Sequence, residues 1–247
     1  MLVDSALPQT PTTMEAAMKL AAGSEAQFWH AQERMEAIAA AQPGFSAVIG
    51  GPIVHSSWMY FCGKFETPDE MSRWHESRQH APVIDKAYST WFDAFYIRKW
   101  RLPEVGEKLA GPLFCETAIS TNAAFDEATT ESVFASIVGT LPEFGPQPFE
   151  TLAEQFEQQP FQLVGPLQEF PKVAPVRYLL LSHWDNALAL SAWLASKSMR
   201  ALSELGAVDT DVHLLIRHRA GERQHQSPDG SHRSWSRHGS AAWMSDI

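Results

Sequence analysis

The second half of this sequence repeats features of the first half at a nearly constant spacing. Gly51, Pro52 and Ile53 correspond to residues 165–167, an offset of 114. At an offset of 119 the matching pairs are Phe65 and Trp184, Trp74 and Trp193, Ser77 and Ser196, Ile97 and Ile216, and Arg98 and Arg217. The difference between the offsets fits a longer hairpin in the second half, at residues 171–175. A repeat of this length predicts a tandem duplication of one structural unit.

Both halves also show the same predicted order of strands and helices, judged from apolar periodicity and turn residues. In the first half we expect strands at 14–21, 45–53, 58–65 and 91–100, and helices at 25–42 and 67–88. In the second half we expect strands at 113–120, 161–170, 176–184 and 212–217, and helices at 126–139 and 188–205. This shared order is typical of a ferredoxin-like unit.

Two of these helices begin with capping residues. Ser24 precedes the first helix with Gln27 three positions later, and Thr67 precedes the second with Glu70 three positions later. A Ser or Thr hydroxyl at this place can accept a hydrogen bond from a backbone N–H of the first turn. We therefore expect both side chains to cap their helices.

A single four-stranded unit leaves one apolar sheet face open, because its helices cover only the other face. Two units can cover each other's open faces, within one chain or between two chains. The prediction is an α+β fold of two tandem ferredoxin-like units in a dimeric α/β-barrel arrangement. Its expected segments are an irregular arm (1–13), domain 1 (14–103), a linker (104–111), domain 2 (112–219) and an extended or disordered tail (220–247).

Charge and composition exclude several classes of partner. The 247 residues include 19 Lys+Arg and 29 Asp+Glu, and the net charge of −10 argues against nucleic acid or an anionic membrane as main partner. No apolar run approaches the ~18 residues of a membrane span, and the first residues do not form a signal peptide. Cys62 and Cys115 lie in apolar strand-like segments, as buried thiols of a reducing compartment do. We therefore expect a cytoplasmic protein.

Three stretches resemble the antibiotic biosynthesis monooxygenase family of dimeric α/β barrels. They are AAGSEAQFWHAQERMEAIAAAQPGF at 21–45, WMYFCGKFETPDEMSRW at 58–74, and the W-x-x-S pair Trp74 and Ser77. The resemblance covers most of residues 14–100, and it covers 112–218 only through strand order, Trp193 and Ser196. It implies a pocket between sheet and helices that is lined by Trp74. The family includes oxygenases that act on aromatic polyketides without metal or flavin, heme-degrading enzymes, and members without known activity.

Two positions after Trp74 bear on which of these activities the resemblance implies. The heme-degrading group carries an iron-binding His ten residues after this Trp, and here that position is Ile84. The Asn of its first strand is also missing, since the first Asn of this chain is Asn122. The cofactor-free group carries a Tyr six residues after the Trp, and here that position is His80. Its counterpart in the second half is Met199. The resemblance therefore favours chemistry without a cofactor, in one half only.

The candidate site residues also have ordinary structural interpretations. Trp74 can form a flat wall for an aromatic ligand, or it can pack in the core. His80 can accept a phenolic proton, or it can be a surface histidine. Tyr60 and Arg98 can polarise oxygens of a substrate, although an Arg on such a strand more often forms a charge pair. His75 and His80, five residues apart on one predicted helix, are about 140° apart and do not form an i, i+4 metal pair.

The leading hypothesis is a cofactor-independent monooxygenase that oxidises a small aromatic or polyketide-like substrate with dioxygen. His80, Trp74, Arg98 and Tyr60 would be its catalytic residues, and the ligand-binding residues would be Ser77, Trp193 and Ser196. Neither GxGxxG nor GxxxxGK[ST] occurs, so no nucleotide cofactor is expected. A non-catalytic ligand-binding or structural protein is the first alternative. A heme enzyme is the second, because the chlorite dismutase family has similar length and two such units per chain. A homo-oligomer is compatible with each hypothesis.

Overall fold

The computed structural model of the chain describes residues 10–121, 132, 161–172, 177–184, 186–224 and 234–239. The predicted helix at 126–139 lies almost entirely outside these residues, as does most of the predicted arm at 1–13. Within the described part of the chain, no helix has both the length and the apolar character needed to cross a membrane.

The first unit has the predicted order of elements. Its members are β1 (Thr12–Leu20), α1 (Glu25–Ala40), β2 (Phe45–Pro52), β3 (Trp58–Phe65), α2 (Pro68–His75), α3 (Ala81–Lys86), the π-helix η1 (Ala87–Trp91) and β4 (Phe92–Arg101). The strands are antiparallel in the order β2-β3-β1-β4. This is the arrangement of a ferredoxin-like unit.

The second unit has the same strand order. Its described members are β5 (Leu113–Thr121), β6 (Phe161–Val164), β7 (Gln168–Phe170), β8 (Arg177–Trp184), α6 (Ala187–Leu194), α7 (Lys197–Leu205), β9 (Gly206–Gln224) and β10 (Ser234–Gly239). Its four main strands are antiparallel in the order β6-β8-β5-β9. The predicted α+β fold of two ferredoxin-like units is therefore confirmed.

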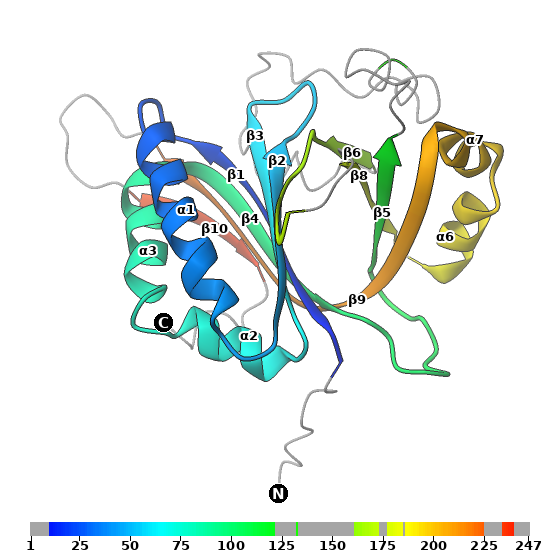
Figure 1. Cartoon of the computed structure of the whole chain (residues 1–247), viewed down its shortest axis with the longest axis horizontal. Helices are drawn as coiled ribbons and strands as arrows, with labels where there is room; N and C mark the ends of the chain where they lie inside the picture. Colours follow the sequence, from blue (N-terminus) through cyan, green and yellow to red (C-terminus); the bar gives the residue numbers. More distant parts are fainter. Residues whose placement is uncertain are drawn as a thin grey trace, which may run out of the picture.

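The two units roll into one barrel. Strand β4 pairs with β9 on one side, and β2 meets β6 and β7 on the other. There Ile53 bridges Val164, and the Val54 N–H donates to the Leu163 carbonyl at 2.9 Å. Helices α1–α3 lie on one flank and helices α6 and α7 on the opposite flank (Figure 1). The apolar sheet faces that each unit leaves open thus cover each other, as predicted.

The pairing of residues between neighbouring strands shows which positions of the two units are equivalent. Glu15 lies opposite Cys62 in the first unit, and Glu116 lies opposite Leu181 in the second. The offset of 119 thus holds between β3 and β8, and it also holds between α2 and α6, whose bounds differ by that number. The pairs Phe65 with Trp184 and Trp74 with Trp193 occupy equivalent places.

Other proposed equivalences are wrong. Glu15 faces Arg98 across β1 and β4, whereas Glu116 faces Asp211 across β5 and β9. Asp211, and not Arg217, therefore takes the place of Arg98, because α3 and η1 add residues before β4 that α7 does not add before β9. The 165–167 match is also one residue out of register, since the position equivalent to Gly51 is Val164.

Several boundaries differ from the prediction. The strand expected at 161–170 is divided into β6 and β7, and the two longer helices expected at 67–88 and 188–205 are each interrupted. Ser196 begins the new helix α7, since its hydroxyl accepts from the Met199 N–H at 3.1 Å. Strand β9 continues to Gln224, past the expected end of domain 2 at 219, and β10 pairs with it inside the predicted tail.

One of the two predicted caps is correct. The Thr67 hydroxyl accepts from the Glu70 N–H at 3.3 Å. The Ser24 hydroxyl does not cap α1, because it donates instead to the carbonyls of Ala21 and Trp91 at 2.6 and 3.1 Å. Ser24 therefore ties the start of α1 to the end of η1.

Gly44 in the turn between α1 and β2 has φ +70°, and a Cβ there would overlap the Glu70 carboxylate. We expect Gly44→Ala to lower the free energy of unfolding by about 2 kcal/mol, from left-handed backbone strain and a displaced hydrogen bond. Gly23 is the matched control, because it has φ +79° and a Cβ there would meet no atom within 4 Å. Gly23→Ala should cost about 1 kcal/mol in urea denaturation. Equal losses for both variants would contradict the overlap.

Candidate functional site

A cavity of about 590 Å³ lies between the helices of the first unit and the outer face of its sheet. Alternate strand residues such as Ala16, Met18 and Ile97 form its floor, because side chains along a strand alternate between the two faces. The side chains with polar groups in its lining include Gln32, Ser72, His75, Glu76, His80, Tyr88 and Lys99. An apolar cavity with a few polar groups is the usual form of a small-molecule site.

Trp74 and His80 lie together on the helix side of the first unit, where His80 lines the cavity and Trp74 does not. Trp74 is buried near the end of α2, and His80 directly precedes α3. Their rings stack with centroids 4.3 Å apart and planes 12° apart. The Ser77 hydroxyl accepts from the backbone N–H of His80 at 3.2 Å, so it orients the turn and does not contact the imidazole. The interrupted helix thus brings two predicted site residues together.

The imidazole of His80 is held in its neutral form. Burial lowers its pKa from 6.5 to about 4. Its Nδ1 is buried and has no hydrogen-bond partner among the described residues. At neutral pH His80 can therefore accept a proton.

We expect NMR titration to show a neutral His80 imidazole down to about pH 5, with the His80→Gln variant identifying its resonances. The lowered pKa also makes the stability of the fold depend on pH. Between pH 6.5 and about 4 the unfolded chain binds a proton at His80 that the folded protein does not bind. The stability of the protein should consequently decrease as the pH falls through this window. A midpoint near 6.5 would contradict the buried environment.

His75 and Lys99 also belong to the cavity, although no sequence pattern identified them. His75 Nε2 lies 2.9 Å from Met14 Sδ, and its ring stacks on that of His80 at 5.5 Å. Burial, the charge of Lys99 and the proximity of His80 lower the pKa of His75 well below its ordinary value. The break after α2 places the two histidines face to face, whereas a continuous helix would separate them.

Tyr60 and Arg98 lie on the other side of the sheet, inside the barrel. The Tyr60 hydroxyl donates to Glu116 Oε1 at 3.4 Å. The Arg98 guanidinium lies 3.8 Å from Glu15 Oε2 and 4.5 Å from the centre of the Tyr96 ring. Strand alternation separates both residues from His80 and Trp74. The expectation that all four share one pocket is therefore wrong.

Trp193 and Ser196 occupy structural positions in the second unit. The Trp193 ring packs against Phe161 and Trp184, with centroids 4.7 and 6.2 Å apart. Ser196 is the cap of α7 described above. The position equivalent to His80 is Met199, which packs in the same apolar cluster as Trp193.

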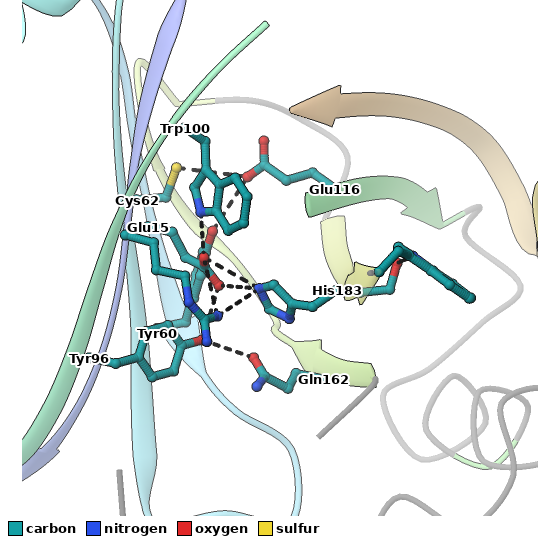
Figure 2. A network of polar contacts seen from close by, with 11 residues as sticks. Glu15, Tyr60, Cys62, Tyr96, Trp100, Glu116, Gln162 and His183 are labelled. Atoms are coloured by element: carbon teal, nitrogen blue, oxygen red, sulfur yellow. Dashed lines mark hydrogen bonds and ion pairs between the residues drawn. The ribbon is translucent and has the colours of Figure 1, made fainter. Parts of the chain in front are cut away.

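The barrel interior holds two buried carboxylates in a polar network (Figure 2). Glu15 on β1 accepts from the Trp100 indole N–H at 2.7 Å and from the Tyr96 hydroxyl at 3.0 Å. His183 Nε2 of the second unit lies 3.1 Å from Glu15 Oε1. One carboxylate of the first unit is thus held by side chains of both units.

Glu116 on β5 is surrounded in the equivalent way. His213 Nε2 of its own unit lies 3.0 Å from Glu116 Oε2, and Lys64 Nζ of the first unit lies 2.6 Å from the same oxygen. By strand register Lys64 is equivalent to His183, and His213 is equivalent to Trp100. Each glutamate therefore binds a last-strand side chain of its own unit and a third-strand side chain of the other.

Electrostatics keep both glutamates ionised. Burial by itself raises the pKa of a carboxyl group, but the Lys64 charge and the His213 hydrogen bond outweigh it at Glu116, and the pKa is lowered. At Glu15 burial is likewise outweighed, by the charges of His183 and Arg98, and the pKa is lowered.

Glu116, Asp211 and His213 place possible metal-ligand atoms within 4.8 Å of one another. The Lys64 ammonium already lies on Glu116, where it supplies the compensating positive charge. This cluster is therefore an ion-pair network between the units.

No family model matches the sequence, and no curated protein matches it. A candidate monooxygenase from Fusobacterium nucleatum superposes with a TM-score of 0.38 and 8% identity, over 86% of this chain and 95% of the other. An anthrone oxidase-like protein superposes with a TM-score of 0.32 and 8% identity, over 86% of this chain and 93% of the other. An aldoxime dehydratase in complex with butyraldoxime superposes with a TM-score of 0.48 and 10% identity, over 84% of this chain and 80% of the other. By its own strand order, this chain is an α+β protein of the closed-barrel class with a ligand-sized cavity in its first unit.

Proposed function

We propose that the protein is a monooxygenase that needs no cofactor and oxidises a hydroxylated aromatic compound in the cavity of the first unit. The observation that supports this most is the neutral imidazole of His80, which lines the cavity and stacks on the buried ring of Trp74 behind it. His80 supplies the base, and aromatic side chains of the cavity lining, such as Tyr88 and Phe92, offer surfaces suited to an aromatic ring.

The reaction begins with transfer of the acidic proton of the substrate to His80. The resulting anion is electron-rich and gives one electron to dioxygen. Superoxide and the substrate radical then combine into a peroxide. For a substrate with a reactive CH2 group, loss of water from this peroxide leaves a carbonyl, so that CH2 and O2 become C=O and H2O. The protein has to position the ring, accept the proton and exclude bulk water.

Because the pKa of His80 is low, proton transfer from the substrate to its imidazole is unfavourable unless other charges stabilise the products. Moving a proton from a phenol of pKa about 10 to an imidazole of pKa about 4 costs roughly 8 kcal/mol. An ion pair 4 Å apart contributes about 4 kcal/mol at the effective dielectric of a protein surface. Attraction of the substrate anion to both the His80 imidazolium and the Lys99 ammonium would offset most of the cost. We therefore assign to Lys99 the oxygen-polarising role first expected of Arg98 and Tyr60.

Oxygen consumption with a panel of hydroxylated anthrones and naphthols tests the proposal directly. We expect turnover with at least one compound, and one atom of 18O2 in the product by mass spectrometry. Binding of these compounds without oxygen uptake would instead support the alternative, a ligand-binding protein, which the largely apolar cavity lining also favours. If the compounds show no binding and no turnover, both functions are excluded.

Heme fits the cavity residues less well. His75 Nε2 already contacts Met14 Sδ, and the position that carries the iron-binding His in the heme-degrading group is Ile84 here, which lines the cavity without a ligand atom for iron. We expect no Soret band near ~400 nm after addition of hemin, because an axial imidazole ligand is the usual anchor of this group. A stoichiometric Soret band would favour the heme alternative.

A further inference from the structure

A second hollow of about 330 Å³ lies between α1 and α3, beside the cavity. Val83 and Trp91 belong to the lining of both spaces, so the two spaces adjoin at these side chains. The remaining lining residues of the hollow are Gln27, His30, Ala31, Arg34, Met35, Pro82 and Lys86. Helices α1 and α3 lie on the same flank of the barrel (Figure 1).

The charge of this hollow is opposite to that of the protein. Its lining includes Arg34, Lys86 and His30 and no carboxylate, although the chain has a net charge of −10. His30 and Arg34 are four residues apart on α1 and share one face of the helix. In the part of the chain that the structure describes, neither Arg34 nor Lys86 has a side-chain ion pair or hydrogen bond.

The two side chains that both spaces share, Val83 and Trp91, are apolar. Trp91 is buried, and its indole N–H donates to Gln27 Oε1 at 3.3 Å. Because both spaces border the same two side chains, a ring bound in the cavity beside Val83 and Trp91 can carry a substituent at its edge that extends past them to the basic side chains of the hollow. Glu33 and Asp85 are adjacent in sequence to these side chains but do not line the hollow.

We propose that the ligand of the cavity carries an anionic group, such as a carboxylate or a sulfonate, which Arg34 and Lys86 bind. This inference rests on the proposed function, in which the cavity holds an aromatic ring. It defines the ligand class as an aromatic compound with a negative charge at one edge. Arg34 can bind such a group through two parallel N–H donors, and Lys86 adds a point charge.

Two fluorescent probes that differ by one sulfonate test this proposal. They are 8-anilinonaphthalene-1-sulfonate and the neutral N-phenyl-1-naphthylamine. We expect the double variant Arg34→Gln/Lys86→Gln to bind the sulfonate about tenfold more weakly than the wild type at low ionic strength, since each exposed charge contributes modestly. The neutral probe should bind both proteins equally. At about 0.5 M salt the difference should largely disappear, because surface charges are then screened.

The matched control is Arg73→Gln/Arg78→Gln, which removes the same charge from residues outside the hollow and should leave both affinities unchanged. Tight binding of the neutral probe together with an unaltered sulfonate affinity in Arg34→Gln/Lys86→Gln would overturn the anion site and leave the proposed function standing. Failure of both probes to bind the wild type would overturn the aromatic cavity, and with it both proposals.

Discussion

Replacing Glu116 by alanine should destabilise the protein by about 3–5 kcal/mol, the usual cost of removing one partner of a buried ion pair. The carboxylate is 2% exposed, and its removal leaves Lys64 and His213 without their charged partner inside the barrel. Urea denaturation followed by circular dichroism measures this loss. The effect should be large because the interactions of Glu116 join both units.

Two comparisons separate this explanation from general damage to the core. The double variant Lys64→Met/Glu116→Leu removes both charges and should recover much of the lost stability, since apolar replacement of a buried pair is often nearly neutral. Glu107 forms a surface ion pair with Arg101, and Glu107→Ala should have little effect. A double variant as unstable as Glu116→Ala would show that packing, and not charge, is responsible.

The same carboxylates determine the acid stability of the protein. The pKa values of Glu15 and Glu116 are lowered in the folded state, so at moderately acidic pH the unfolded chain binds protons that the folded protein does not. Their contribution is present above the ordinary value of 4.5 and is lost as the pH falls below it. The variants Glu15→Gln and Glu116→Gln should consequently show a shallower decrease of stability in acid.

Replacing His80 by alanine should lower the turnover number of the proposed oxygenase about 10²–10⁴-fold, the usual contribution of a general base. Binding of the aromatic substrate should change much less, because the aromatic side chains of the cavity lining, such as Tyr88 and Phe92, remain in place. Oxygen uptake gives the turnover number, and fluorescence titration gives the affinity.

Ser77→Ala is the control for this prediction, since the Ser77 hydroxyl accepts from the backbone N–H of His80 and the variant should retain most of the activity. Trp74→Ala should lower kcat more than it raises KM, because Trp74 does not line the cavity and acts through the ring of His80, which stacks on it. Equal oxygen uptake by wild type and His80→Ala would remove His80 from the mechanism.

The sequence predicted the fold better than it predicted the site. The closed arrangement followed from apolar faces that a single unit cannot cover, and β3 begins and ends where expected, at Trp58 and Phe65. Trp74 was expected to line the pocket, but its ring lies behind that of His80 and outside the lining of the cavity. Tyr60 and Arg98 were misplaced because alternation along β3 and β4 directs them into the barrel, whereas the neighbouring Lys99 faces the helices.

The buried network could not be predicted from local patterns. Glu15 and Glu116 stand in ordinary strand segments, and their partners Lys64 and His183 come from the other unit, far away in sequence. Glu15 and Glu116 are 101 residues apart in the sequence, but this spacing identifies them as equivalent positions only once the register of β1 and β5 is known. His75 was missed because the end of α2, which brings it against His80, has no clear sequence marker.

Joining both units in one polypeptide allows the two flanks of the barrel to diverge. In an assembly of identical subunits every substitution appears twice, so a change that benefits one flank is imposed on the other. Here the positions of His75 and His80 are held by Leu194 and Met199 on the opposite flank. One molecule can therefore keep a pair of histidines beside a cavity on one flank and apolar side chains at the equivalent positions of the other flank, which a symmetric pair of chains could not do.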